Sequence, residues 1–218
     1  MGTWAIHIRI AEKILKKGYD LHEEGFLIGN IGPDCGVINE EGTNFIPTME
    51  VSHWSTSGKR DIDPEKFFKA HLDKNIEDKK ERSFYIGYYT HLLCDIEWRN
   101  DIIRRMEYDE NYFPMKTDRS FINELRKEWY ILDRSYFDEN QDSLFWTKFQ
   151  HIESFPDYLE FYPKGSITNQ IKYIAEFYTK PDQDLNRKYK FLTPDQMSKF
   201  IDNTVKLIES KLIENRLV

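Results

Sequence analysis

The sequence predicts an all-α protein: a single helical domain over residues 1–218, built as a bundle of several helices. Apolar residues recur every three or four positions along most of the chain, and no segment alternates apolar and polar residues as a half-buried strand does. Helical segments also begin and end on residues that favour those positions. The length of 218 residues fits one domain, since domains commonly hold about 100–200 residues.

The first part of the chain divides into helices around a loop-rich stretch. A helix is expected over residues 3–17, and Gly18 ends it as glycine does at helix C-termini. Residues 25–34 form a short apolar run, broken by glycines, that fits either a buried helix or a series of turns. Residues 35–62 have the character of a loop, and Asp63-Pro64 opens a helix to about residue 74. The inward face of the first helix carries Trp4, His7, Ala11, Ile14 and Leu15, with Arg9, Glu12, Lys13 and Lys16 elsewhere.

The rest of the chain is expected to be almost wholly helical. The strongest pattern spans about 83–106, where one face collects aromatic, apolar and two polar residues. Further helices are expected near 118–138, 143–153, 166–179 and 194–215. The last begins with a capping box that has proline at its first helical position, Thr193-Pro194-Asp195-Gln196. The face of the 83–106 helix is made by Phe84, Tyr88, His91, Asp95, Trp98 and Ile102.

Composition excludes several classes of protein. With 31 Lys and Arg against 38 Asp and Glu, the net charge of -7 argues against nucleic acid as the main partner, because phosphate backbones select for clustered basic residues. No run approaches the roughly 18–20 apolar residues of a membrane span. The first residues do not form a secretion signal, so a cytoplasmic protein is expected. Two cysteines, Cys35 and Cys94, do not make a disulfide framework.

His91 and Asp95 are the first candidates for chemistry. They lie four residues apart on the expected 83–106 helix, so their side chains project from one face. That face is otherwise large and apolar, and an unpaired charge buried there would cost several kcal/mol. A divalent metal would supply the missing partner, since His nitrogen and Asp oxygen are ordinary ligands. The alternatives are a His–Asp pair that only satisfies itself and a histidine satisfied by a backbone carbonyl.

Three further residues, His7, Asp34 and His53, can likewise be interpreted either as metal ligands or as structural residues. His7 lies on the apolar stripe of the first helix, where a histidine satisfied within the core is the ordinary explanation. Asp34 closes a Gly-Asn-Ile-Gly-Pro-Asp segment, in which aspartate is a common turn residue. His53 stands between Ser52 and Trp54 in the loop-rich stretch. Alone, each residue favours the structural explanation; in this order along one chain, they suggest a common site.

The set resembles the zinc-dependent phospholipase C family, which is related more distantly to the fungal single-strand-specific nucleases. The resemblance covers roughly residues 3–105. It is carried by His7-Ile8-Arg9-Ile10-Ala11, Leu27-Ile28-Gly29-Asn30-Ile31-Gly32-Pro33-Asp34, Ser52-His53-Trp54 and Tyr88-Tyr89-Thr90-His91-Leu92-Leu93-Cys94-Asp95.

This resemblance implies a hydrolase of phosphate esters with a metal site, usually zinc, among its helices. The counterpart of Asp34 bridges two metals in that family, and a further ligand stands where this chain has Asp101 instead of the usual histidine. The expected ligands are therefore His7, Asp34, His53, His91 and Asp95, with Asp101 as an additional one.

Two departures from the family pattern favour one or two ions over three. Secreted members use an N-terminal tryptophan as a ligand, whereas Met1-Gly2-Thr3 precedes Trp4 here. A later His-x-x-x-Glu pair has no counterpart, because His151 is followed four residues on by Phe155. Asp133 could supply the missing carboxylate, or it could form an ion pair with Arg134 or a nearby lysine. Zinc is expected, and iron or manganese would also suit these ligands.

The expected reaction is hydrolysis of a phosphoester by a metal-activated water, which Asp34 would help to orient. No serine or cysteine comes with a convincing base. The substrate would be a small phosphoester or a phospholipid head group, without stable membrane insertion, because no apolar or basic lipid-binding feature is evident in the sequence. Two alternatives are a helical phosphohydrolase of nucleotide-like substrates, disfavoured by the lack of a His-Asp dipeptide, and a non-catalytic metal-binding or interaction protein.

Overall fold

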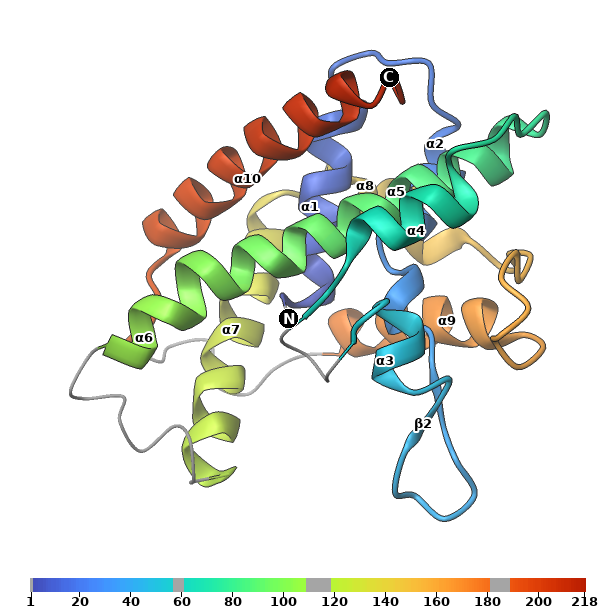
Figure 1. The fold of residues 1–218 in the computed structure, drawn as a ribbon. Helices are drawn as coiled ribbons and strands as arrows, with labels where there is room; N and C mark the ends of the chain where they lie inside the picture. Colours follow the sequence, from blue (N-terminus) through green and yellow to red (C-terminus); the bar gives the residue numbers. More distant parts are fainter. Residues whose placement is uncertain (1, 57–60, 109–118, 181–188) are drawn as a thin grey trace.

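The computed structural model describes residues 2–56, 61–108, 119–180 and 189–218. It confirms the all-α class (Figure 1). The helices before residue 109 are α1 (Trp4–Leu15), α2 (Glu23–Gly29), the 3-10 turn η1 (Gly32–Asp34), α3 (Met49–Ser52), α4 (Pro64–His71), α5 (Lys79–Glu97), the π-helical turn η2 (Trp98–Ile103) and α6 (Arg104–Tyr108). After it come α7 (Arg119–Glu139), α8 (Leu144–Thr147), the 3-10 turn η4 (Phe149–His151), α9 (Ser166–Thr179) and α10 (Pro194–Glu214).

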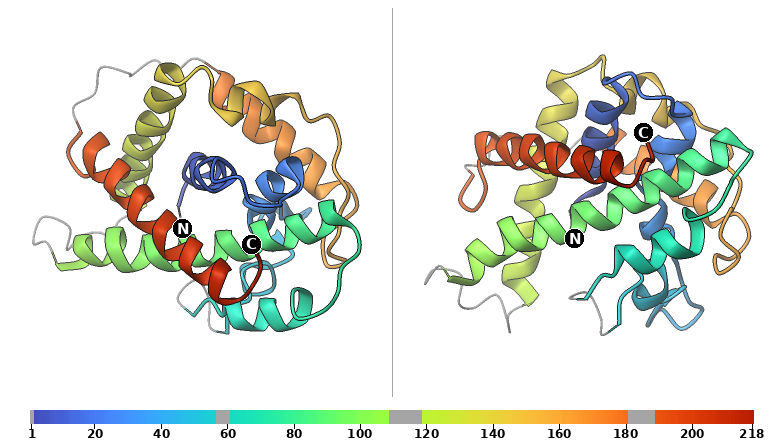
Figure 2. Two further views of the ribbon diagram at one scale, coloured as in Figure 1. Left: turned by 90° about the horizontal axis from the view of Figure 1, so that it is seen from above. Right: turned by 45° about the horizontal axis from the view of Figure 1, so that its top comes forward.

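Helix α1 lies in the middle of the molecule, surrounded by α5, α7, α9 and α10 (Figure 2). It is buried on nearly every side, so the expectation that Arg9 and Glu12 would lie away from the core was wrong. The Arg9 guanidinium stacks 3.7 Å from the ring centroid of Tyr136 on α7. Glu12 accepts a hydrogen bond of 3.2 Å from the backbone N–H of Leu144, at the start of α8. Glu12 is therefore hydrogen-bonded inside the bundle, and the buried Arg9 guanidinium is held against an aromatic ring.

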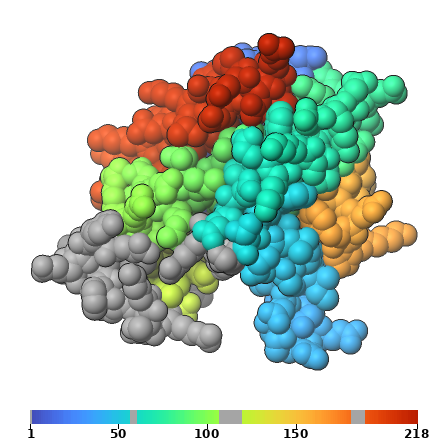
Figure 3. All heavy atoms as spheres, viewed as in Figure 1, coloured from blue at the N-terminus to red at the C-terminus, as the bar shows by residue number. Residues whose placement is uncertain are grey.

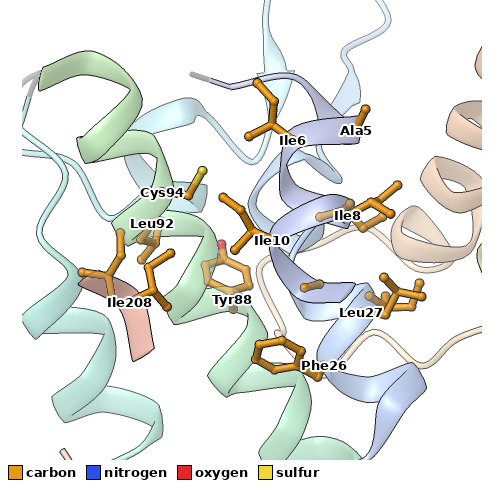
Figure 4. Packing of buried hydrophobic residues seen from close by; sticks show 14 of the residues in the cluster. Ala5, Ile6, Ile8, Ile10, Phe26, Leu27, Tyr88, Leu92, Cys94 and Ile208 are labelled. Atoms are coloured by element: carbon orange, nitrogen blue, oxygen red, sulfur yellow. The ribbon is translucent and has the colours of Figure 1, made fainter. Parts of the chain in front are cut away.

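Helices α2 and α5 cross with their backbones in contact. A Cβ atom at Gly29 would lie 2.1 Å from the carbonyl oxygen of Phe84, and one at Gly87 would lie 2.3 Å from that of Phe26. Residues 25–34, for which the sequence left helix and turn open, thus form a buried helix followed by a 3-10 turn. Figure 4 shows the core beside this crossing, where isoleucines of α1 pack near Phe26 of α2 and Tyr88 of α5.

Two of the expected helices have different geometry from the prediction. The helix expected over 83–106 begins earlier, at Lys79, and continues through the π-helical turn η2 into α6. The helix expected over 143–153 is broken into α8 and η4, because Lys148 has a non-helical backbone (φ -135°, ψ -61°). The capping box at the start of α10 is confirmed.

The loop-rich stretch contains a small hairpin that the sequence did not predict. Strand β1 (Val37–Ile38) pairs antiparallel with β2 (Phe45–Ile46), and two residues per strand are too few for an alternation to be recognised. The hairpin projects from the helical body (Figures 1 and 3). Among the described residues, no helix combines the length and apolar character needed to cross a bilayer.

Candidate metal centre

Four separate segments bring five of the expected ligands to one place. His7 comes from the central helix α1, and Asp34 is the last residue of η1. His53 directly follows α3, and His91 and Asp95 lie one turn apart on α5. The side chains of His7, His53, His91 and Asp95 are at most 1% exposed, whereas that of Asp34 is 11% exposed. Asp34 therefore forms the solvent side of the cluster.

The carboxylate of Asp95 lies among the three imidazoles. Its Oδ1 is 3.5 Å from Nε2 of His7, and its Oδ2 is 3.5 Å from Nε2 of His91 and 3.6 Å from Nε2 of His53. These separations are longer than good hydrogen bonds, which have donor–acceptor distances of about 2.7–3.2 Å. The donor atoms therefore face one another across a space instead of closing on each other.

Several of these buried atoms have no hydrogen-bond partner within the described part of the chain. Buried polar groups are nearly always satisfied, so such a concentration of exceptions requires an explanation. Imidazole nitrogen and carboxylate oxygen are ligands that zinc prefers, and an ion would satisfy these buried atoms together. The unpartnered atoms facing the space are Nε2 of His7, Nε2 of His53, Nε2 of His91 and Oδ2 of Asp95.

The ligand atoms form two overlapping groups of three. One group is His7, His91 and Asp95, and the other is Asp34, His53 and His91. Within each group the atoms lie within 4.8 Å of one another. His91 is common to both, and its ring stacks on that of His7 with 3.7 Å between centroids. The residues present thus fit a metal ion.

Other groups fix the orientation of the imidazoles. Nδ1 of His91 lies 2.8 Å from the carbonyl oxygen of Asn30, and Nδ1 of His53 lies 2.9 Å from the hydroxyl of Ser52. When Nδ1 of His91 donates a hydrogen bond to that carbonyl, Nε2 is left with the electron pair that can bind a metal. Such a hydrogen bond from the other ring nitrogen usually supports a metal-bound histidine. The backbone N–H of Gly2 donates to Oδ1 of Asp95 at 2.9 Å. Sequence reasoning missed these supports, because two of the three act through the backbone.

The electrostatics favour the metal-binding protonation states of Asp95, Asp34 and His7, whereas the pKa of His91 is raised, because the nearby carboxylates outweigh the effect of burial. Burial raises the pKa of Asp95, but the neighbouring positive charges and hydrogen bonds outweigh this and hold it well below its usual value. For His7, burial and the proximity of His91 lower the pKa to about 4. Burial also raises the pKa of Asp34, yet the nearby imidazoles of His53 and His91 bring it below its usual value. Ionised carboxylates and a neutral imidazole are the forms that coordinate.

Asp101 is not brought into this cluster. It lies in η2, and its carboxylate pairs with Arg105. The two residues line a surface hollow that also includes Asn203 and Leu207 of α10. The additional ligand expected at this position therefore has no support in the geometry.

Asp133 also lies outside both groups of ligand atoms. It is fully buried on α7, where it accepts hydrogen bonds from the Thr3 hydroxyl at 2.9 Å and from the Tyr178 hydroxyl at 2.8 Å. Arg134, the alternative ion-pair partner, donates instead to the carbonyl of Phe177 at 2.9 Å. Burial raises the pKa of Asp133 to about 6, although its hydrogen bonds oppose this.

An Asp133→Asn substitution should therefore change the pH dependence of stability. The native pKa lies above the unfolded value, so the carboxyl stabilises the fold at low pH and this contribution is lost as pH rises through about 6. The asparagine variant lacks this loss. As the pH rises from about 4 to about 8, the free energy of unfolding of the variant minus that of the parent should increase by roughly 2 kcal/mol. Denaturant unfolding of the metal-free proteins measures this, and a constant difference would contradict it.

Comparison with known proteins agrees with this geometry. A model of the zinc-dependent phospholipase C family matches residues 6–213, nearly the whole chain. The chain belongs to the zinc-dependent phospholipase C family. No curated protein and no solved structure matches it.

Membership of the zinc-dependent phospholipase C family confirms the predicted class of activity. The members are hydrolases acting on phosphoric esters, so the chain is a metal-dependent phosphodiesterase of the phospholipase C type. The family implies zinc as the metal and a phospholipid as the substrate. The match also extends beyond residues 3–105, the part in which the sequence motifs were evident.

Proposed function

We propose that this phospholipase C cleaves the phosphodiester of a phospholipid head group with one or two zinc ions held by five side chains. The observation that supports this most directly is the convergence of buried, unpartnered ligand atoms from four segments of the chain. The expected place of action stays the cytoplasm, a prediction from the sequence. The proposed ligands are His7, Asp34, His53, His91 and Asp95.

The two groups of ligand atoms share one imidazole nitrogen, which limits how two ions could be held. Nδ1 of His91 faces the Asn30 carbonyl, so only Nε2 is directed at the cluster. This one nitrogen can coordinate only one ion. A second ion would then need a bridging carboxylate, and Asp34 and Asp95 each have two oxygens for that purpose. A single zinc needs no bridge, which is why the number of ions is the first quantity to measure.

The protein's own residues define the rest of the chemistry. A bound zinc lowers the pKa of water and polarises a phosphoryl oxygen. Asp34, at the solvent side and held ionised, is placed to accept a hydrogen bond from the attacking water and so orient it. Both cysteines are poor nucleophiles, because burial raises the pKa of the Cys35 and Cys94 thiols well above their usual value. Direct attack by water therefore remains the favoured route.

Metal removal tests this proposal. Elemental analysis should find one or two zinc ions per chain, and chelation should abolish hydrolysis of monomeric dihexanoyl phosphatidylcholine until zinc is restored. Free zinc at a thousandfold excess over its dissociation constant should raise the free energy of unfolding by about 4 kcal/mol. A phosphomonoester such as p-nitrophenyl phosphate serves as the comparison substrate. Full activity without metal, or a zinc-loaded protein that does not cleave the phosphodiester, would contradict the proposal.

A further inference from the structure

The β1–β2 hairpin exposes apolar side chains. Among the described residues, large hydrophobic side chains with high exposure are concentrated on the hairpin and on α3, which follows it. Ile38 is the direct cross-strand partner of Phe45, so the two side chains lie on one face of the ribbon. This pair is defined here as the hairpin apolar face. The exposed side chains in this region are Ile38 (63%), Phe45 (50%), Ile46 (47%) and Val51 (44%), and those elsewhere are Tyr173, Leu207 and Ile213.

Both arms of the hairpin lead directly to proposed zinc ligands. Asp34 lies three residues before β1, and α3, which follows β2, ends next to His53. The stems are also anchored to the core. The hydroxyl of Tyr162 donates to the carbonyl of Gly32 at 2.7 Å, and the hydroxyl of Tyr88 donates to the carbonyl of Ser52. A surface that contacts the hairpin therefore has a fixed position relative to the metal cluster.

The charge around the hairpin indicates which kind of surface it suits. No lysine or arginine occurs between residues 18 and 58. Glu40, Glu41 and Glu50 are exposed in the same region. Basic residues normally supply the attraction to anionic lipids, and here they are replaced by acidic ones. A surface without net charge, such as phosphatidylcholine, avoids this repulsion.

The exposed apolar area is too small for a stable dimer. The four exposed side chains of this region together expose on the order of 400 Å² of apolar surface. A standard interface buries about 800 Å² on each partner. Shallow contact with a lipid surface requires much less area, since its strength simply grows with the apolar area buried.

We propose that the hairpin apolar face contacts a zwitterionic phospholipid surface and so presents a head group to the solvent side of the cluster at Asp34. This inference rests on the proposed phospholipase C activity, because it explains how a buried site receives a substrate that resides in a membrane surface. It also corrects the expectation from the sequence, in which no exposed apolar feature was evident. Contact of this kind is peripheral and needs no membrane-spanning helix.

A double substitution on the hairpin tests the inference. In an Ile38→Ser/Phe45→Ser variant, co-flotation with palmitoyl-oleoyl phosphatidylcholine vesicles should fall about tenfold or more, because the apolar groups that would enter the interface are gone. Hydrolysis of the same vesicles should fall with it. Hydrolysis of monomeric dihexanoyl phosphatidylcholine should be unchanged, since neither residue belongs to the cluster. The control is Leu207→Ser/Ile213→Ser on α10, which removes exposed apolar side chains elsewhere and should leave all three measurements unchanged.

Each outcome distinguishes this inference from the proposed function. If the parent protein cleaves the monomeric lipid but does not float with phosphatidylcholine vesicles, the hairpin inference is wrong and the proposed function stands. Unchanged flotation of the hairpin variant also overturns it, as does tighter binding to phosphatidylserine vesicles. A parent that elutes as a dimer in size-exclusion chromatography, and a variant that elutes as a monomer, would assign this face to self-association. If no lipid is cleaved in either form, the proposed function itself fails.

Discussion

An Asp95→Asn variant should lose zinc and, with it, on the order of a thousandfold or more of the phosphodiesterase activity. Asp95 approaches all three imidazoles of the cluster, and it is the only carboxylate in the ligand group that contains His7. Asparagine keeps the shape but removes the charge that compensates a divalent cation. Elemental analysis and the rate on monomeric dihexanoyl phosphatidylcholine measure the two losses.

Asp101→Asn is the matched control for this experiment. It makes the same change of charge on the same helical stretch, at a carboxylate that the sequence nominated and that the structure places beside Arg105. Zinc content and activity should stay within about twofold of the parent, as for a surface position away from the chemistry. If Asp101→Asn lost metal and Asp95→Asn retained it, the assignment of the cluster would be wrong.

Gly29→Ala should be among the most destabilising single substitutions in the described part of the chain. The added Cβ would lie 2.1 Å from the carbonyl oxygen of Phe84 and 2.9 Å from the Cα of Gly87. These are backbone atoms that cannot rotate away, so α2 and α5 must separate. We expect a loss of at least about 2 kcal/mol in the free energy of unfolding, measured by denaturant titration.

The same substitution should also weaken metal binding, although Gly29 touches no ligand. Separation of the two helices would move the Asn30 carbonyl away from His91 and would shift Asp34. Gly36→Ala is the control, because its Cβ would meet nothing closer than 3.4 Å. Its unfolding free energy should change by less than about 0.5 kcal/mol. Equal stability of the two variants would show that the crossing tolerates a methyl group.

Local patterns predicted most of the helices correctly, since spacing and caps depend on neighbouring residues. The helix predicted over residues 166–179 coincides with α9, and that over 194–215 ends one residue beyond α10. The structural features that were not predicted depend on tertiary contacts or on segments too short to show a pattern. Burial of Arg9 requires the ring of Tyr136, which lies on a helix distant in sequence. The break at Lys148 and the two-residue strands have no periodic signal of sufficient length.

Three of the candidate ligands were predictable because they violate a local rule, whereas Asp34 and His53 were identified through the resemblance of their motifs to the family. His7 and the His91–Asp95 pair are polar residues on apolar faces, and the structure brings them together with Asp34 and His53. Their supports were not predictable, because the carbonyl of Asn30 and the backbone N–H of Gly2 carry no residue-type signal. Asp101 was nominated because the resembled family has a ligand six residues after the aspartate of its His-x-x-x-Asp motif, and this spacing does not determine where a side chain points within a π-helical turn.

The central position of α1 links formation of the metal site to packing of the helices around it. His7 lies on α1, which the other helices surround, so the five proposed ligands are together only when α1 is packed against α5 and the segments that carry Asp34 and His53. A partly folded chain therefore lacks the complete set of zinc ligands. Zinc should therefore bind to the folded protein, from the side where the Asp34 side chain is partly exposed to solvent. The bound ion should then lower the rate of unfolding, because it holds α1 in the bundle.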